Sequence, residues 1–191
     1  MPNYYDPRVS PLNLGTYHMV GLDEFEPQRV NNFEVQIVGL TGLTSVTRGI
    51  PVTDKASDYI TLSVASYGAP QINVQPITVS YGNNKIKFAG LPEFPDSSIS
   101  INDYIGINVE NILTAWQKLV YNPMTQVVGR ASQYKKVAYL IEYDPSGQQA
   151  RQWQLNGCWP SSLQLGEFNQ EGNNVRQITM TLTYDWAVPL Y

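Results

Sequence analysis

Apolar and polar residues alternate along several short segments of the chain, which is the pattern of a β-strand with one buried face. The most regular of these segments is residues 175–185. Its apolar face consists of Ile178, Met180, Leu182 and Tyr184. Its other face is polar and uncharged and consists of Gln177, Thr179, Thr181 and Thr183. We therefore predict a strand with one face packed on a core and the other face in water.

The same alternation predicts further strands elsewhere in the chain. They are expected at residues 32–38, 59–65, 99–104 and 137–143. In the first of them Phe33, Val35 and Ile37 share one face, and this strand is predicted to begin the folded domain, which runs from residue 32 to residue 191.

Turn-forming residues between strand patterns predict two hairpins. Residues 72–80 and 85–89 flank Tyr81-Gly82-Asn83-Asn84, where glycine and asparagine tolerate a positive φ. Pro76 lacks an N–H group, so its strand must lie at an edge or contain a bulge. The second hairpin joins residues 137–143 to 151–156.

One segment, residues 105–121, has apolar residues spaced by three and four, and it is the one helical pattern that we identify. Asn108 or Asp103 are candidate caps, and Asn122-Pro123 ends the pattern. Because the opposite face is polar, the helix is expected to cover one side of a sheet. The predicted apolar stripe consists of Val109, Ile112, Leu113, Trp116, Leu119 and Val120.

Three of the four tryptophans are predicted to lie in the core. Trp116 belongs to the apolar stripe of the helix, Trp153 alternates with Leu155 in a strand, and Trp159 follows in the same C-terminal region.

Two segments lack any regular period. Residues 1–31 form a predicted extended arm interrupted by prolines, and residues 39–58 form a long loop rich in glycine. The arm either packs on its own domain or reaches a neighbouring subunit. Contacts with another copy of the chain are predicted for the apolar residues of both segments, namely Tyr4, Tyr5, Leu12, Leu14, Val46, Ile50 and Val52.

Composition points to a protein that contacts other proteins. The chain of 191 residues fits one domain with an arm. Only 15% of its residues are charged, against roughly 25% in ordinary soluble domains, and charge is depleted at interface cores. With 12 basic and 16 acidic residues, the net charge of −4 argues against stable binding of nucleic acid. No membrane anchor or secretion signal is evident. The alternative is a lightly charged secreted β-domain.

The sequence offers no set of residues for catalysis or for a cofactor. Its one histidine, His18, has no partner at metal-ligand spacing, and its one cysteine, Cys158, permits neither an intrachain disulfide nor a cysteine-based zinc site. Phosphate-binding glycine loops and hydrolase motifs are missing. We therefore expect no enzyme activity, no cofactor and no metal.

The last third of the chain resembles the tail tube proteins of contractile-tailed bacteriophages. The resemblance rests on Tyr134-Lys135-Lys136, on Trp153-x-Leu155-x-Gly157-Cys158-Trp159-Pro160, and on an alternating strand that ends in Tyr184-Asp185-Trp186. It is specific from about residue 131 to 187, and the strand at 32–38 and the single helix support it. Related folds form the inner tubes of type VI secretion systems, tailocins and other contractile injection machines, and the baseplate proteins on which tubes start.

The resemblance implies a mainly β fold, a β-sandwich or incomplete barrel with one flanking helix. Six copies would close into a ring whose inner strands form a continuous barrel, and the rings would stack into a tube. It implies a structural virion protein, assembled in the host cytoplasm, with sheath and baseplate proteins as partners. DNA would pass through the lumen without specific binding during ejection.

The uncharged face of residues 177–183 is a candidate lumen surface, because an uncharged polar lining lets DNA pass without adhesion. The alternative is that this face simply points to solvent. Two other hypotheses remain beside the tube subunit. One is a monomeric β-sandwich that binds glycans or a host surface through exposed tyrosines, and the other is a hydrolase built on acidic loops that contain Asp54 and Asp58.

Overall fold

The computed structural model describes residues 28–40, 43, 55–104, 106–169 and 174–190. Its strands pair in antiparallel fashion throughout. They are β1 (Phe33–Val38), β2 (Val64–Tyr67), β3 (Asn73–Tyr81), β4 (Asn84–Glu93), β5 (Ser97–Asn102), β6 (Tyr121–Asn122), β7 (Val127–Val128), β8 (Lys136–Tyr143), β9 (Gln149–Gln164), β10 (Gln177–Thr183) and β11 (Trp186–Leu190). The helices are α2 (Ala56–Ser63), α3 (Val109–Val120) and α4 (Ala131–Tyr134).

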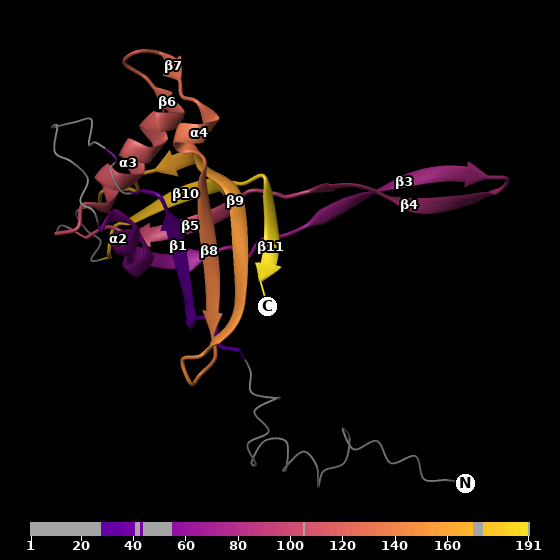
Figure 1. Cartoon of the computed structure of the whole chain (residues 1–191), viewed down its shortest axis with the longest axis horizontal. Helices are drawn as coiled ribbons and strands as arrows, with labels where there is room; N and C mark the ends of the chain where they lie inside the picture. The colour runs from indigo at the N-terminus through magenta and orange to yellow at the C-terminus, as the bar shows by residue number, and fades with distance from the viewer. Residues whose placement is uncertain (1–27, 41–42, 44–54, 105, 170–173, 191) are drawn as a thin grey trace, which may run out of the picture.

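The main sheet bends into two layers around one core. Its hydrogen-bonded order is β1-β8-β9-β10-β5-β2, and β11 adds to β9. The long strand β9 belongs to both layers, because its first part pairs with β8 and β11 and its last part pairs with β10. Figure 1 shows β1, β8 and β11 crossing the direction of β5 and β10. Since β1 and β2 are not paired, the described sheet is an open structure and not a closed barrel.

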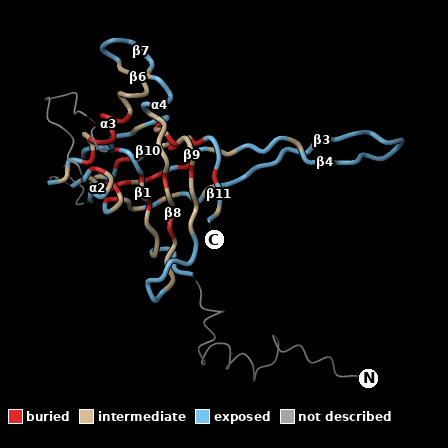
Figure 2. Tube along the Cα trace, viewed as in Figure 1, coloured by how far each residue is buried: buried red, intermediate tan, exposed pale blue. Residues whose placement is uncertain are grey.

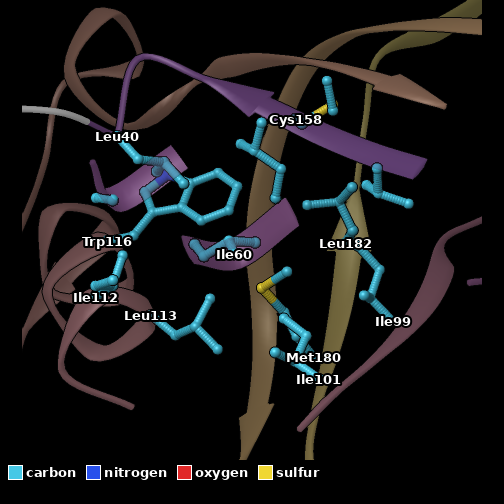
Figure 3. Packing of buried hydrophobic residues seen from close by; sticks show 14 of the residues in the cluster. Leu40, Ile60, Ile99, Ile101, Ile112, Leu113, Trp116, Cys158, Met180 and Leu182 are labelled. Atoms are coloured by element: carbon cyan, nitrogen blue, oxygen red, sulfur yellow. The ribbon is translucent and has the colours of Figure 1, made fainter. Parts of the chain in front are cut away.

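The core lies between these two layers and the helices (Figure 3). Trp116 of α3 is completely buried, and its indole N–H donates to the carbonyl oxygen of Tyr134 at 2.8 Å. Ile99 and Met180, paired across β5 and β10, are also completely buried. The alternation predicted for residues 175–185 is confirmed, because Ile178, Met180 and Leu182 are all 0% exposed.

The prediction of a strand at residues 59–65 is wrong, because most of this segment is the helix α2. The buried residues of α2 are Ala56, Ile60 and Ser63, at helical spacings of four and three. Leu62 alternates with Ile60 and Val64 and would share their core face in a strand, but it is 76% exposed. The buried Ser63 hydroxyl is satisfied within the helix, because its Oγ donates to the Tyr59 carbonyl oxygen at 2.6 Å.

The prediction that residues 105–121 contain the one helix is therefore incomplete. The predicted helix is present as α3 at Val109–Val120, but the described chain contains two further helices, α2 and the short α4. Asn108 precedes α3, yet it makes no side-chain cap hydrogen bond and adopts a left-handed conformation with φ of 55°. Among the described residues, no helix is long and apolar enough to cross a membrane.

Both predicted hairpins are confirmed, and the bulge expected at Pro76 is present. The register of β3 and β4 shifts between Val74 and Pro76. At this point a Cβ atom on Gly90 would collide with the carbonyl oxygen of Gln75, so the bulge requires a glycine. The sequence patterns did not reveal β11, which pairs with β9 from Trp186 to Leu190.

Candidate assembly surfaces

The hairpin of β3 and β4 extends away from the body of the protein (Figure 1). Its two strands pair with each other and with no other described strand. Every residue of β3 is exposed, and so is every residue of β4 except Gly90 (Figure 2). Because an isolated two-stranded hairpin is marginally stable in water, we expect a hairpin of this length to be covered by another surface.

The hairpin has one apolar face and one polar face. Directly opposed residues share a face of a two-stranded ribbon, and the apolar pairs are Ile77 with Phe88 and Val79 with Ile86. The polar pairs are Thr78 with Lys87 and Ser80 with Lys85. Ile77 is 57% exposed and Phe88 is 56% exposed, so nothing in the described chain covers the apolar face. An uncovered apolar face of this kind marks an interaction surface.

A second surface is the polar face of the layer formed by β5, β10 and the end of β9. Because Ile178, Met180 and Leu182 point into the core, their neighbours in β10 point to the opposite face. In the register, hydroxyl and amide side chains of β5 and of β9 lie beside these outward-facing residues of β10. The resulting uncharged face consists of Gln177, Thr179, Thr181, Ser98, Ser100, Asn102, Ser162 and Gln164.

The predicted lumen residues thus lie together on one continuous surface with like neighbours. Gln177 is exposed, whereas Thr179, Thr181 and Thr183 are half-buried. Thr183 is paired with Trp159 at the end of this face. The side chains of this face can donate and accept hydrogen bonds without carrying charge, so they suit contact with water.

The free edges of the main sheet form a third kind of surface. In the layer that contains β11, the two outermost strands are β1 and β11. Of these, β11 presents Trp186, Val188 and Leu190 at 50%, 42% and 37% exposure. In the other layer, β2 is the outermost strand. Unpaired edges invite pairing with another chain, and closing a ring is one way in which proteins remove them.

The predicted core tryptophans occupy different depths. Trp116 is completely buried. Trp153 packs against the core while partly exposed, and Trp159 is half-buried and meets Tyr134 edge to face at 5.9 Å between ring centroids. The predicted contact residues of the arm and the loop lie outside the described residues, namely Tyr4, Tyr5, Leu12, Leu14, Val46, Ile50 and Val52.

Two titratable groups among the described residues, Cys158 and Arg176, are held by specific contacts. Cys158 is completely buried, its thiol donates to the Leu155 carbonyl oxygen, and burial raises its pKa to about 12. Arg176 pairs with Asp103 and Glu110, each at 2.8 Å, and so joins the start of β10 to the end of β5 and to α3. The described residues contain no cluster of three or more histidine, cysteine, aspartate or glutamate side chains that could hold a metal ion.

The apolar face of the hairpin is visible in the sequence as alternation. Ile77 and Val79 alternate in β3, and Ile86 and Phe88 alternate in β4. Alternation alone does not tell whether the apolar face meets the chain's own core or another molecule. The burial of each residue in the folded chain was needed to separate these two cases.

Comparison with solved structures finds similar folds in contractile injection systems. The tube-terminating cap of the anti-feeding prophage is 19% identical, with a TM-score of 0.60 over 86% of this chain and 91% of that chain. The sheath/tube terminator of an extracellular contractile injection system (PVC) is 17% identical, with a TM-score of 0.63 over 87% and 98%. A chain of the PVC sheath-tube complex is 16% identical, with a TM-score of 0.62 over 89% and 97%.

At these identities the solved structures establish a shared fold. A comparison with curated proteins finds no match. The family evidence comes from the sequence itself, because residues 31–187 match the model of the T4-like virus tail tube protein gp19. This match spans most of the chain and confirms the resemblance to tail tube proteins. The chain is a member of the T4-like virus tail tube protein gp19 family.

Proposed function

We propose that this tail tube protein assembles into rings of six copies that stack into the inner tube of a contractile particle. In a phage, the particle would be a virion and the tube would conduct DNA during ejection. Sheath and baseplate proteins would be its other partners, in keeping with the complexes that contain the similar structures.

The observation that carries this proposal is the uncovered apolar face of the β3–β4 hairpin. Its residues leave the body of their own subunit, so the surface that covers them must come from elsewhere (Figure 2). A second copy of the chain is the natural source in a family of tube proteins. A contact between a hairpin on one copy and a different surface on the next is heterologous, and such contacts generate rings or helical stacks.

The uncharged face of β5, β9 and β10 supports a role as the lumen lining. Strong binding to DNA requires cations that neutralise phosphates, and this face has none. Anionic groups would repel DNA, and this face has none of those either. Water held by hydroxyl and amide groups would therefore separate the wall from passing DNA.

Electron microscopy of the purified chain at high concentration tests the proposal. Rings with six subunits, or tubes of stacked rings, are the expected result. A chain that stays monomeric over the whole concentration range, and binds glycans as a monomer, would instead support the alternative of a β-sandwich binding module.

A tube-terminating subunit is a second candidate function. It is favoured by the similarity to a tube-terminating cap and to a sheath/tube terminator, which match as well as the chain of the sheath-tube complex does. A terminator would form single rings that bind one end of a tube and stop its growth, whereas a main tube subunit would form long tubes alone. A baseplate-proximal initiator or the inner tube of a tailocin would share the ring but differ in partners.

A further inference from the structure

Among the described strands, β9 has partners on both edges only along its first part. Strand β8 pairs along one edge as far as Cys158, and β10 and β11, which follow each other in the chain, pair along the other edge. Beyond Cys158, the edge that β8 leaves has no partner strand in the described chain. Pro160 lies in this stretch, and proline within a sheet is confined to edges and bulges. Ser161–Gln164 of β9 therefore forms a free edge of the layer that carries the uncharged face.

The other free edge of this layer belongs to β2, at the far end of the order β9-β10-β5-β2. Each neighbouring pair in this order is antiparallel, so β9 and β2 run in opposite directions. Rotation about a ring axis keeps the sense of each strand along that axis, so the β9 edge of one copy can meet the β2 edge of the next as an antiparallel pair. The uncharged face would continue across this seam, from Ser162 and Gln164 to Ser66, which pairs with Ser100.

A groove lies directly beside the β2 edge. It has a volume of about 610 Å³ and lies between the start of β1 and the whole of β2. Phe33, Val64 and Leu140 are apolar parts of its wall, and Val30, which is 94% exposed, also lines it. Pockets of this volume can enclose a small molecule, so the groove has room for a few side chains. A neighbouring copy that pairs with β2 would either leave this hollow open or fill it.

An apolar turn lies directly beside the β9 edge. It joins β6 to β7, and residues 121–128 include no charged residue. Met124 and Val127 in this turn are 86% and 60% exposed. Tyr121 of β6 lines a hollow together with Ser161 of β9, so the turn begins next to the free edge of β9. A projecting cluster of exposed apolar side chains marks an interaction surface.

The turn is held in one shape by its own contacts. The Met124 N–H donates to the Asn122 side-chain oxygen at 3.0 Å, and the Gln126 N–H donates to the Asn122 backbone carbonyl at 2.8 Å. At the end of the turn, a Cβ atom on Gly129 would collide with the carbonyl oxygen of Leu119, so the close return of the chain requires a glycine. A projection that is already ordered loses little conformational freedom when it docks.

We infer that the β6–β7 turn of one copy fills the groove beside β2 in the adjacent copy of the ring. This contact rests on the ring assembly proposed above. Both features lie on the side of the layer that faces away from the proposed lumen, because β6 follows α3, which packs on β9, and the groove opens between the two layers. Figure 1 shows β6 and β7 at the end of the molecule opposite the start of β1. Each copy would therefore offer its turn to one neighbour and its groove to the other, which is the heterologous contact that closes a ring.

Disulfide trapping between two different chains tests the contact. One chain carries Val30→Cys at the groove, the other carries Met124→Cys in the turn and a tag that changes its mass, and the two are assembled together and gently oxidised. Cys158 is completely buried in both. A mixed dimer is expected at least about tenfold above that of a matched pair with Leu62→Cys in place of Val30→Cys, because docking raises the effective concentration of the two thiols. Leu62 is 76% exposed and lies on α2, outside the groove.

A single chain that carries both Val30→Cys and Met124→Cys gives a second readout. The two positions lie at opposite ends of the subunit, so a disulfide within one chain is not expected (Figure 1). Oxidation of the assembled rings should therefore give a ladder of linked chains that ends at six.

Each outcome decides the question. Rings visible by microscopy with no more mixed dimer than the Leu62 pair overturn the docking of the turn and leave the tube proposal intact. The same result is expected if another part of the same chain, or a different protein, fills the groove. A ladder that runs past six would place the contact between rings, which also overturns the inference. Failure of the unmodified chain to form rings overturns the proposed function together with the inference.

Discussion

Lys135 Nζ donates to both carboxylate oxygens of Asp185, at 2.7 Å each, across fifty residues of sequence. The Asp185 backbone N–H also donates to the Asn156 carbonyl oxygen at 2.9 Å. The Asp185 side chain lies directly over Gly157, where the chain adopts a φ of 69°. The three segments that carry the sequence resemblance therefore meet at one structural junction, where β8, β9 and β11 are held in register.

This junction predicts that Gly157→Ala destabilises the unassembled chain by about 1–3 kcal/mol. The alanine Cβ would collide with the Asp185 carboxylate, in addition to being strained at a positive φ. Urea denaturation of the unassembled chain measures the loss. Gly147→Ala is the matched control, because Gly147 also has a positive φ of 83° but open space around its Cβ position. Equal losses in the two variants would show that the contact with Asp185 has no energetic role.

The packing of α3 on the sheet predicts that Trp116→Ala lowers the free energy of unfolding by more, about 3–5 kcal/mol. The substitution leaves a cavity in a completely buried position and removes the hydrogen bond to Tyr134. Thermal or urea unfolding of the unassembled chain is the measurement. Trp186→Ala provides the control, since this side chain is 50% exposed and its removal leaves no enclosed cavity. A Trp116→Ala chain as stable as Trp186→Ala would contradict the core assignment.

Burial raises the pKa of the Cys158 thiol from 9.0 to about 12, so the native chain holds this group protonated. The resulting stabilisation is complete below pH 9 and is lost as pH rises from 9 towards 12, because the unfolded chain releases the proton first. At pH 10 we expect iodoacetamide to label Cys158 rapidly in the urea-unfolded chain and slowly in the folded chain. Comparable labelling rates in both states would mean that the thiol is accessible.

Strand faces were predictable from the sequence because their alternation is a local property. Residues 177–183 illustrate this, with Ile178 and Met180 in the core as expected. The strand prediction for residues 59–65 is wrong because Ile60, Leu62 and Val64 alternate as they would in a strand. In the structure this segment is mostly helical, and the helix buries Ile60 and exposes Leu62. Seven residues are too few for the two periods to be told apart.

The candidate surfaces were less predictable because they depend on what the rest of the chain leaves uncovered. The apolar residues of the β3–β4 hairpin have the pattern of a core strand, and only the fold shows that they face outward. The groove between β1 and β2 is likewise a property of the topology, since the two strands that border it lie far apart in the sequence.

The hairpin surface predicts that Ile77→Ser combined with Phe88→Ser abolishes assembly while leaving the subunit folded. Both side chains are more than half exposed, so the free energy of unfolding should change by no more than about 0.5 kcal/mol. Sedimentation velocity measures assembly, and circular dichroism follows the fold. The control variant alters the opposite face of the hairpin at paired positions, Thr78→Ala with Lys87→Ala. Normal tubes from the Ile77/Phe88 variant would remove the apolar face from the assembly contact.

The uncharged face predicts that Thr179→Lys combined with Thr181→Lys gives normal tubes that retain DNA. Both side chains lie on the proposed lumen wall, where added cations would bind phosphates and release counterions, so retention should fall steeply as salt concentration rises. The measurement is the amount of DNA that assembled tubes protect from nuclease. Protection is the deciding quantity because DNA bound outside a tube remains open to digestion. Gln154→Lys with Asn156→Lys is the control, since these residues lie on the opposite layer, beside Tyr139 and Trp186 in the register. Protection by the control variant alone would place that layer at the lumen and turn the threonine face outward.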